Sequence, residues 1–435
     1  MILFTHHTGE PHGILGAQVA ATFLQRRLSI PSIVVGIQRD FSKEHLLRFI
    51  DEYYAGKKRQ VAFSHLCGRK DLMDLIQELK QAGFVTMLGG PQARQDYEGE
   101  PGASAYPHRF KGLNPVVDLV FHGPVDGLRL DHLGLRGVFG RPWTKDIFLE
   151  VDWSNLYTFS DSLQKLEVRL GQVLNAVGCP YSGNRQTVVL PPPTILRGKG
   201  IPELEVRSEG CVFCDVSRDK GYHGLVERSS AIAQIAGLPE VGARKIPFEL
   251  IDEAPIRSLG RLMEDTERHG IKLSQINLVC RVDDINVHAS ELADVLTLAR
   301  RQNVKIMFAS IGFESVSDRL LQYFCKGVNV SDIVRCVETL RRLKDCFGDT
   351  LLYRRDEGAN HGFIRPTPWD DGETIRELDS TIFLHRFFED ILPEHSTPLI
   401  IHHASSLGDW IRAVESKTDV RFTRDGTWIE WWNPT

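Results

Sequence analysis

At 435 residues the chain exceeds one ordinary hydrophobic core, which predicts two or three domains. Its formal net charge of -5 argues against a surface that follows nucleic-acid phosphates, and the absence of any run of 18 apolar residues argues against a membrane span. Eight cysteines are too few and too unevenly spaced for a disulfide framework, and the first residues lack a signal-peptide pattern. We therefore expect a cytoplasmic protein without nucleic-acid or membrane partners.

The first 130 residues alternate short apolar runs with amphipathic segments. Repeated strand–helix units of this kind predict a parallel, doubly wound α/β sheet, whose ligand crevice lies beyond the carboxyl ends of its strands. The patterns predict strands over 1–5, 32–37, 60–66, 85–90 and 116–123, and helices over 16–28, 43–56 and 70–83.

Polar and glycine residues follow these strands. Glycines at strand ends would let a flat macrocycle or its nucleotide tail approach the backbone, although ordinary turn glycines of such a sheet are the alternative. The stretch "HGILGAQ" lacks the GxGxxG spacing, which makes a dinucleotide site a weak hypothesis. The candidate contacts are Gly13, Gly16, Ser64, Gly89, Gly90 and Gly123.

Residues 146–200 are less regular. The stretch "PPPTILRGKG" (191–200) cannot be helical, because it holds three consecutive prolines and then two glycines. We expect it to space two domains or to run along an edge.

Strand–helix alternation resumes at about residue 204. This second set predicts another α/β unit, a partial or full barrel whose site lies at the strand C-termini. The patterns predict strands over 204–208, 276–282, 304–313 and 361–369, and helices over 330–348 and 372–388.

The loop "EGCVFCDV" after the first of these strands holds Cys211 and Cys214 at metal-binding spacing. Zinc sites pair one CxxC with a second CxxC or an HxxxH, and neither occurs elsewhere in the sequence. A thioredoxin-type pair would follow the first strand of a small βαβ domain, whereas this pair begins a second domain. An iron–sulfur cluster remains, and it needs further cysteine.

At this point a family resemblance becomes specific. "LEVRSEGCVFCDV" resembles the cluster loop of the radical S-adenosylmethionine (SAM) superfamily. "SIGFESVSDRLLQYFCKGVNVSDIVRCVETLRRL" and "GFIRPTPWDDGET" resemble later segments of the branch that carries an N-terminal cobalamin-binding domain. "PHGILGAQVAATFL", "LGGPQA" and "VVDLVFHGPVDGL" resemble parts of that domain. The resemblance covers roughly residues 1–130 and 200–385, and the order of the segments carries it.

The resemblance implies a flavodoxin-like cobalamin-binding domain (1–145), a linker (146–200), a radical-SAM-type partial (β/α) barrel (201–385) and a C-terminal extension (386–435). It implies a 4Fe-4S cluster, SAM and cobalamin as cofactors, and an external electron donor. The implied activity is radical chemistry on an unactivated carbon of a small-molecule substrate, with methyl transfer as a candidate. Two alternatives stay open: non-radical cobalamin-dependent methyl transfer with a structural cluster, or a degenerate, non-catalytic cobalamin- or metal-binding regulatory protein.

The cluster motif departs from the superfamily pattern C-x3-C-x2-C, because Arg207 occupies the place of the first cysteine. Cys179 in "VGCPYSGN" resembles the front of the family loop and is the candidate third ligand. A long insertion between ligands is tolerable, since each doubling of loop length costs only about 0.6 kcal/mol. The alternative is that Cys179 is a small buried hydrophobe.

The resemblance also assigns cofactor contacts. Phe213 matches an aromatic residue that packs near the adenine of SAM, and Glu314 and Ser315 match residues that could bind its ribose or amino group. A cap on the following helix is the alternative for Glu314. Many cobalamin domains carry D-x-H-x-x-G, whose histidine ligates cobalt; here "EPHGILG" offers His12 with one residue too many, and members of this branch often bind cobalamin without that histidine.

Overall fold

A computed structural model describes residues 1–434 of the chain. The chain divides into two compact units. Unit 1 comprises residues 1–172, 233–239 and 424–428, and unit 2 comprises the remaining described residues. Within the described residues, none of the helices combines the length and apolar character that crossing a bilayer requires.

Unit 1 is built on an eight-stranded sheet. Its strand order is β6-β5-β4-β3-β1-β2-β7-β8, and only β8 runs antiparallel to its neighbour. The strands are β1 (Ile2–His6), β2 (Ile33–Ile37), β3 (Gln60–Ser64), β4 (Val85–Gly89), β5 (Leu119–His122), β6 (Gly137–Gly140), β7 (Leu156–Phe159) and β8 (Leu163–Lys165). The helices are α1 (Leu15–Arg27), α2 (Lys43–Tyr53), α3 (Lys70–Gln81) and α4 (Ala93–Glu98).

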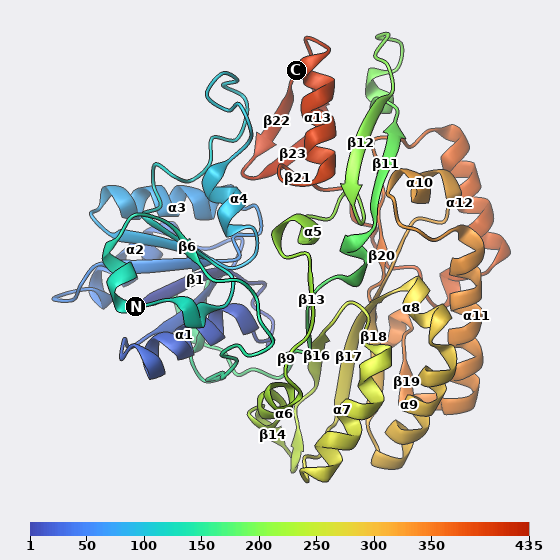
Figure 1. The fold of residues 1–435 in the computed structure, drawn as a ribbon, viewed down its shortest axis with the longest axis horizontal. Helices are drawn as coiled ribbons and strands as arrows, with labels where there is room; N and C mark the ends of the chain where they lie inside the picture. Colours follow the sequence, from blue (N-terminus) through green and yellow to red (C-terminus); the bar gives the residue numbers. More distant parts are fainter. Residues whose placement is uncertain (435) are drawn as a thin grey trace. The chain divides into compact units, whose positions relative to one another are not determined.

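The two-residue period of the strands decides which face each helix covers. In β1, Ile2 and Phe4 join a hydrophobic cluster with the apolar stripes of α2 and α3, whereas Leu3 points to the opposite face. Helix α1 contributes nothing to that cluster and lies on the other side of the sheet (Figure 1). Burial on both faces explains why these strands read as continuous apolar runs.

Unit 2 contains a second, largely parallel sheet. The strand order is β19-β18-β17-β16-β9, and β20 also pairs with β18. Its strands are β9 (Gly171–Leu174), β16 (Phe248–Ile251), β17 (Gln275–Arg281), β18 (Lys305–Glu314), β19 (Leu351–Leu352) and β20 (Gly362–Phe363). The helices of unit 2 are α5 (Val216–Asp219), α7 (Ile256–Arg268), α8 (Val282–Val287), α9 (Ala289–Gln302), α10 (Asp318–Tyr323), α11 (Val330–Phe347), α12 (Gly372–Leu384) and α13 (Ser406–Ser416). Helix α6 (Arg228–Ala236) begins in unit 2, and its residues from Ala233 on belong to unit 1.

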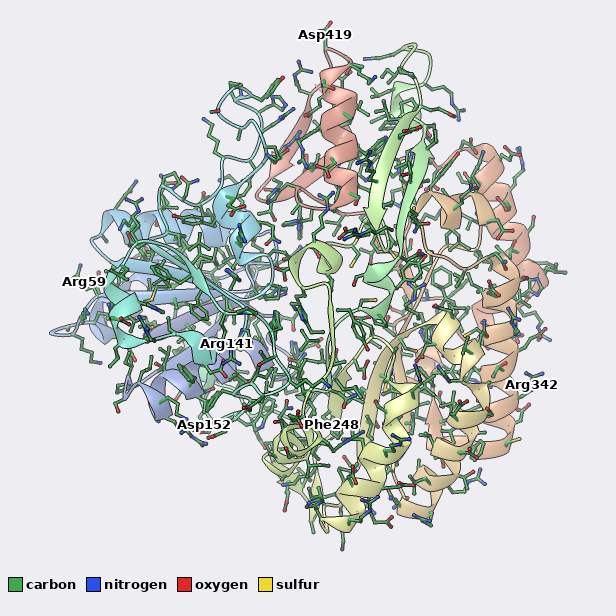
Figure 2. The ribbon with its side chains drawn as sticks, viewed as in Figure 1. Arg59, Arg141, Asp152, Phe248, Arg342 and Asp419 are labelled. Carbon is green, nitrogen blue, oxygen red and sulfur yellow. The ribbon has the colours of Figure 1, made fainter. Side chains whose placement is uncertain are left out.

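The helices of unit 2 shield its sheet. Helices α7, α9 and α11 lie side by side along it (Figure 1), and Phe248, the first residue of β16, is fully buried. Arg342 stands on the outward, exposed side of α11 (Figure 2). With its two parallel sheets and their covering helices, the chain has the α/β class that the sequence predicts.

Four smaller strand groups complete the fold. They are the hairpin of β11 (Arg185–Leu190) and β12 (Leu204–Glu209), the pair β10 (Ala176–Gly178) with β13 (Tyr222–Leu225), the pair β14 (Glu240–Val241) with β15 (Arg244–Lys245), and a sheet of β21 (Ile401–His402), β23 (Trp428–Pro434) and β22 (Phe422–Asp425).

The structural units differ from the predicted segments. Unit 1 extends past residue 145 to Gln172, because β7 and β8 complete its sheet. Residues 146–200 are therefore no linker, since they also carry β9, β10 and β11. The proline-rich stretch 191–200 forms the tip of the β11–β12 hairpin. This tip is anchored by two hydrogen bonds, Thr194 N–H to the Pro368 carbonyl at 2.7 Å and Trp369 Nε1 to the Pro191 carbonyl at 3.1 Å.

Candidate functional site

The β11–β12 hairpin lies inside the cysteine loop of unit 2. The chain leaves β10 at Gly178, passes Cys179, enters the hairpin and returns at Cys211. Antiparallel pairing begins at Arg185 and Glu209, and the Gly210 N–H donates to the Asn184 carbonyl at 2.9 Å. The hairpin therefore returns the chain to the place where it left, which brings Cys179 and Cys211 into one loop.

This geometry accounts for the incomplete motif. Without residues 183–210, the sequence Cys179-Pro-Tyr-Ser would continue directly into Cys211-Val-Phe-Cys214, which has the spacing C-x3-C-x2-C. Arg207 pairs with Thr187 inside the hairpin. It stands four residues before Cys211 in the sequence only because the hairpin is inserted between Ser182 and Cys211, so it does not replace a cysteine of the motif.

One expectation about this loop is wrong. The strand "LEVRS" does not belong to the parallel sheet, because β12 pairs with β11 alone in a two-stranded sheet. Its burial alternates, with Leu204, Val206 and Ser208 inside, and one half-buried face looks the same in a hairpin as in a sheet edge. The chain instead reaches Cys179 from β9, a strand of the larger sheet, by way of β10, which pairs with β13.

All three cysteines are free thiols with partial exposure. Burial raises the pKa of Cys214 to about 12, and the nearby Asp215, Cys211 and Glu253 add to the rise. Burial also raises the pKa of Cys179, again with Glu253 among the causes. Protonated, desolvated thiols of this kind lose their protons when a metal binds, so metal binding here would be coupled to proton release.

The donor set fits an iron–sulfur cluster. Cysteine thiolates are the usual ligands of such clusters. Three thiols in one loop therefore offer the kind of ligand that such a cluster takes.

Two buried cations border the loop. Arg281, the last residue of β17, donates from Nη1 to the Cys211 sulfur at 3.6 Å. Lys326 is 5% exposed and donates to Glu314 Oε1 at 2.8 Å. Burial lowers the pKa of Lys326, but Glu314 and Cys211 outweigh it, so the pKa lies above its usual value. The site therefore places fixed positive charge beside the sulfur of Cys211.

The loop is tied to the segment that carries Lys326. The Cys325 carbonyl accepts from the Tyr181 hydroxyl at 3.0 Å and from Gln186 Nε2 at 3.3 Å. The ring of Phe213 meets Phe324 edge-on, with centroids 5.5 Å apart. Phe213 therefore lies in the cysteine loop, and its ring contacts the side chain of Phe324.

Glu253 is a site residue that sequence reasoning missed. It follows β16 at the sheet edge where Arg281 and Glu314 end their strands. Burial raises its pKa, while Lys326 and Arg281 act in the opposite direction. The only available signal was an acidic pair directly after the apolar strand "FELI", which is also common in loops.

The two predicted SAM contacts at the end of β18, Glu314 and Ser315, differ from each other. Glu314 faces the buried ammonium of Lys326 and does not cap α10, whose N-cap residue is Ser317. Ser315 is 2% exposed, and its hydroxyl accepts from the Ser317 N–H at 3.2 Å. The hydroxyl of Ser315 is therefore engaged in a buried turn, whereas Glu314 belongs to the charged groups beside the thiols.

In unit 1, the predicted residues Ser64, Gly89, Gly90 and Gly123 share one edge of the sheet. They lie at or just after the carboxyl ends of β3, β4 and β5, which are consecutive in the sheet. Gly90 (φ +90°) packs on the Ser64 hydroxyl, and a Cβ at Gly123 (φ +82°) would lie 2.1 Å from the Arg141 carbonyl oxygen. Local packing therefore suffices to explain these two glycines.

Local packing also explains residues of the loop before α1. A Cβ at Gly13 would lie 2.3 Å from the ring of Trp153, whereas Gly16 is exposed and faces open space. The ring of His12 stacks on His7, with centroids 4.4 Å apart. His12 is thus held at this edge with its side chain 31% exposed.

The comparisons with known proteins agree with this fold. No family model matches the sequence, and no curated protein matches it. Among solved structures, the chain is similar to the apo, selenomethionine-labelled cobalamin-dependent S-adenosylmethionine radical enzyme OxsB, at 12% sequence identity and a TM-score of 0.57. The match covers 98% of this chain and 63% of that chain, so this chain spans less than two thirds of the enzyme's length. This likeness shows that the chain shares the fold of that solved structure, which agrees with the fold that the resemblance implies.

Proposed function

We propose that the protein is a cobalamin-dependent radical SAM enzyme that acts on an unactivated carbon of a small molecule, with methyl transfer as the candidate reaction. One observation carries the proposal: the hairpin returns the chain so that Cys179, Cys211 and Cys214 share one loop with interrupted C-x3-C-x2-C spacing. The fold likeness supports the same class of chemistry.

In this proposal the thiolates of Cys179, Cys211 and Cys214 would hold a 4Fe-4S cluster to which SAM binds. When bound, the cluster would supply the electron for cleaving SAM into methionine and a 5′-deoxyadenosyl radical, and cobalamin would carry the methyl group. The residues of the chain itself would position SAM and shield it from water. The Glu253 carboxylate acts electrostatically on Cys179 and Cys214 and suits the amino group of SAM, while the ring of Phe213 suits its adenine.

We place cobalamin at the carboxyl edge of the unit 1 sheet, where Ser64, Gly89 and His12 lie. This placement can be tested by absorption spectroscopy of the protein loaded with hydroxocobalamin. His12 ligates cobalt if His12→Ala changes the spectrum of the bound cobalamin, and an unchanged spectrum removes His12 from the metal. A cytoplasmic location, an external electron donor and a small-molecule substrate complete the proposal.

The central experiment is anaerobic reconstitution with iron and sulfide, followed by dithionite and SAM. We expect about four irons per chain, as a 4Fe-4S centre requires, and formation of 5′-deoxyadenosine. Iron without 5′-deoxyadenosine would favour the non-radical methyl-transfer alternative. Zinc in place of iron would refute the proposal and favour a metal-binding regulatory role.

Cys179 has its own test. Cys179→Ala should lose most of the reconstituted iron, because two thiolates do not complete the site. Cys280→Ala is the matched control, since Cys280 is a 2% exposed thiol within β17 and packs in the core. Equal iron in the two variants would exclude Cys179 as a ligand.

A further inference from the structure

Arg281 is held beside the cysteine loop by three hydrogen bonds and one aromatic contact of its guanidinium group. Its side chain is 8% exposed. Nε donates to Asp283 Oδ1 at 2.8 Å, Nη2 donates to the Lys326 carbonyl at 2.6 Å, and Nη1 donates to the Cys211 sulfur at 3.6 Å. The guanidinium carbon stands 3.8 Å from the centre of the Tyr181 ring. The group therefore has one orientation, and in it one N–H is directed at sulfur.

This arrangement is costly unless the sulfur carries negative charge. Burying a guanidinium removes it from water, and Asp283, its one acidic hydrogen-bond partner, is itself 43% exposed. Lys326 is a second buried cation nearby, and its ammonium group forms an ion pair with Glu314. A metal-bound thiolate at Cys211 would give the directed N–H a charged acceptor, and charge-assisted hydrogen bonds are about twice as strong as neutral ones.

We propose that Arg281 sets the reduction potential of the cluster by its hydrogen bond to the Cys211 sulfur. This inference rests on the proposed function, because it requires a redox-active cluster on Cys179, Cys211 and Cys214. Reduction adds one electron, supplied by the external reductant, to the cluster and its sulfur ligands. A fixed cation at a ligand sulfur stabilises the reduced state more than the oxidised state, and hydrogen bonds to the sulfurs are known determinants of cluster potential.

Tyr181 has a supporting part in this geometry. It lies between Cys179 and the hairpin, so the segment that delivers one thiol also supplies the platform under the guanidinium. Lysine could keep a positive charge at position 281, but it has neither the planar face for the Tyr181 ring nor the fork that reaches three acceptors at once. The Arg281 fork, and not charge alone, directs the N–H at sulfur.

The test is a redox titration of the reconstituted cluster, followed by electron paramagnetic resonance, in the full-length protein. Arg281→Met should lower the reduced-to-oxidised ratio about tenfold at a fixed solution potential, which corresponds to about 59 mV for one electron. Arg281→Lys should shift the ratio in the same direction by less. Arg244→Met is the matched control, because Arg244 donates to the Asn303 carbonyl at 3.0 Å at the opposite end of the strands.

Each outcome decides the question. A lowered potential in Arg281→Met with wild-type iron content and an unchanged Arg244→Met supports the proposal. An unchanged potential in Arg281→Met, or an equal shift in the control, overturns it while leaving the proposed function intact. If neither Arg281 variant retains iron while Arg244→Met does, Arg281 is needed to hold the cluster, and its potential-setting role is rejected. Failure of the wild-type protein to take up iron refutes the proposed function itself.

Discussion

Lys326→Met should destabilise unit 2 by far more than the loss of a surface ion pair. Lys326 and Glu314 are 5% and 13% exposed, and their charged atoms lie 2.8 Å apart. The substitution would leave the Glu314 carboxylate buried without its cation. Breaking a buried pair in this way costs about 3–5 kcal/mol. For a domain of this size, where 1 kcal/mol moves Tm by about 2–4 °C, we expect a fall of about 6–20 °C.

The assay is thermal unfolding in a double-mutant cycle. Lys326→Met combined with Glu314→Gln should recover much of the loss, because replacing both members of a buried pair is often close to neutral. Lys70→Met is the matched control. Lys70 pairs with Asp74 at 2.7 Å on the surface of α3, with exposures of 62% and 47%, so its loss should cost under about 1 kcal/mol. If Lys326→Met lowers the free energy of unfolding by no more than Lys70→Met does, the prediction for the buried pair is wrong.

Two further predictions concern other buried groups. Burial raises the pKa of Asp284 from 3.8 to about 6, so its contribution to stability is present below about pH 4 and is lost as pH rises through 6. Asp284→Asn should therefore gain up to about 3 kcal/mol relative to wild type between pH 4 and 7, measured by denaturant unfolding at both values; a constant difference would contradict this. In unit 1, the buried Tyr54 hydroxyl accepts from the Ile2 N–H at 2.9 Å and donates to the Gln60 carbonyl. Tyr54→Phe should cost about 1–3 kcal/mol, seen as a lower urea midpoint at constant slope, and an unshifted midpoint would count against it.

The sequence alone determined the class of the fold. Apolar runs flanked by amphipathic helices predict parallel strands, because only strands buried on both faces are apolar throughout. The pattern predicts strands over 60–66 and 85–90 and a helix over 70–83, and the structure has them over 60–64, 85–89 and 70–81. The edge where Ser64 and Gly89 meet also follows, since parallel strands place their carboxyl ends together.

Local pattern could not separate a hairpin strand from a strand of the main sheet, because both alternate with a period of two residues. The sequence of residues 204–208 therefore favoured a strand that leads into a barrel, and Arg207 favoured a replaced cysteine. Only the pairing of Arg185 with Glu209, distant in sequence, shows that the chain leaves the loop and returns to it.

The charges around the thiols were also decided by tertiary structure. Glu253, Arg281, Glu314 and Lys326 come from four separate points of the chain, and nothing in the sequence pairs them with one another. Their pairings depend on strand order and on a 10-residue strand, β18, that ends at the same edge as β17. The sequence supplies the thiols and the strands, whereas the hairpin closure and the buried cations beside Cys211 exist only after long-range packing, because contacts between distant residues leave no local periodic signal.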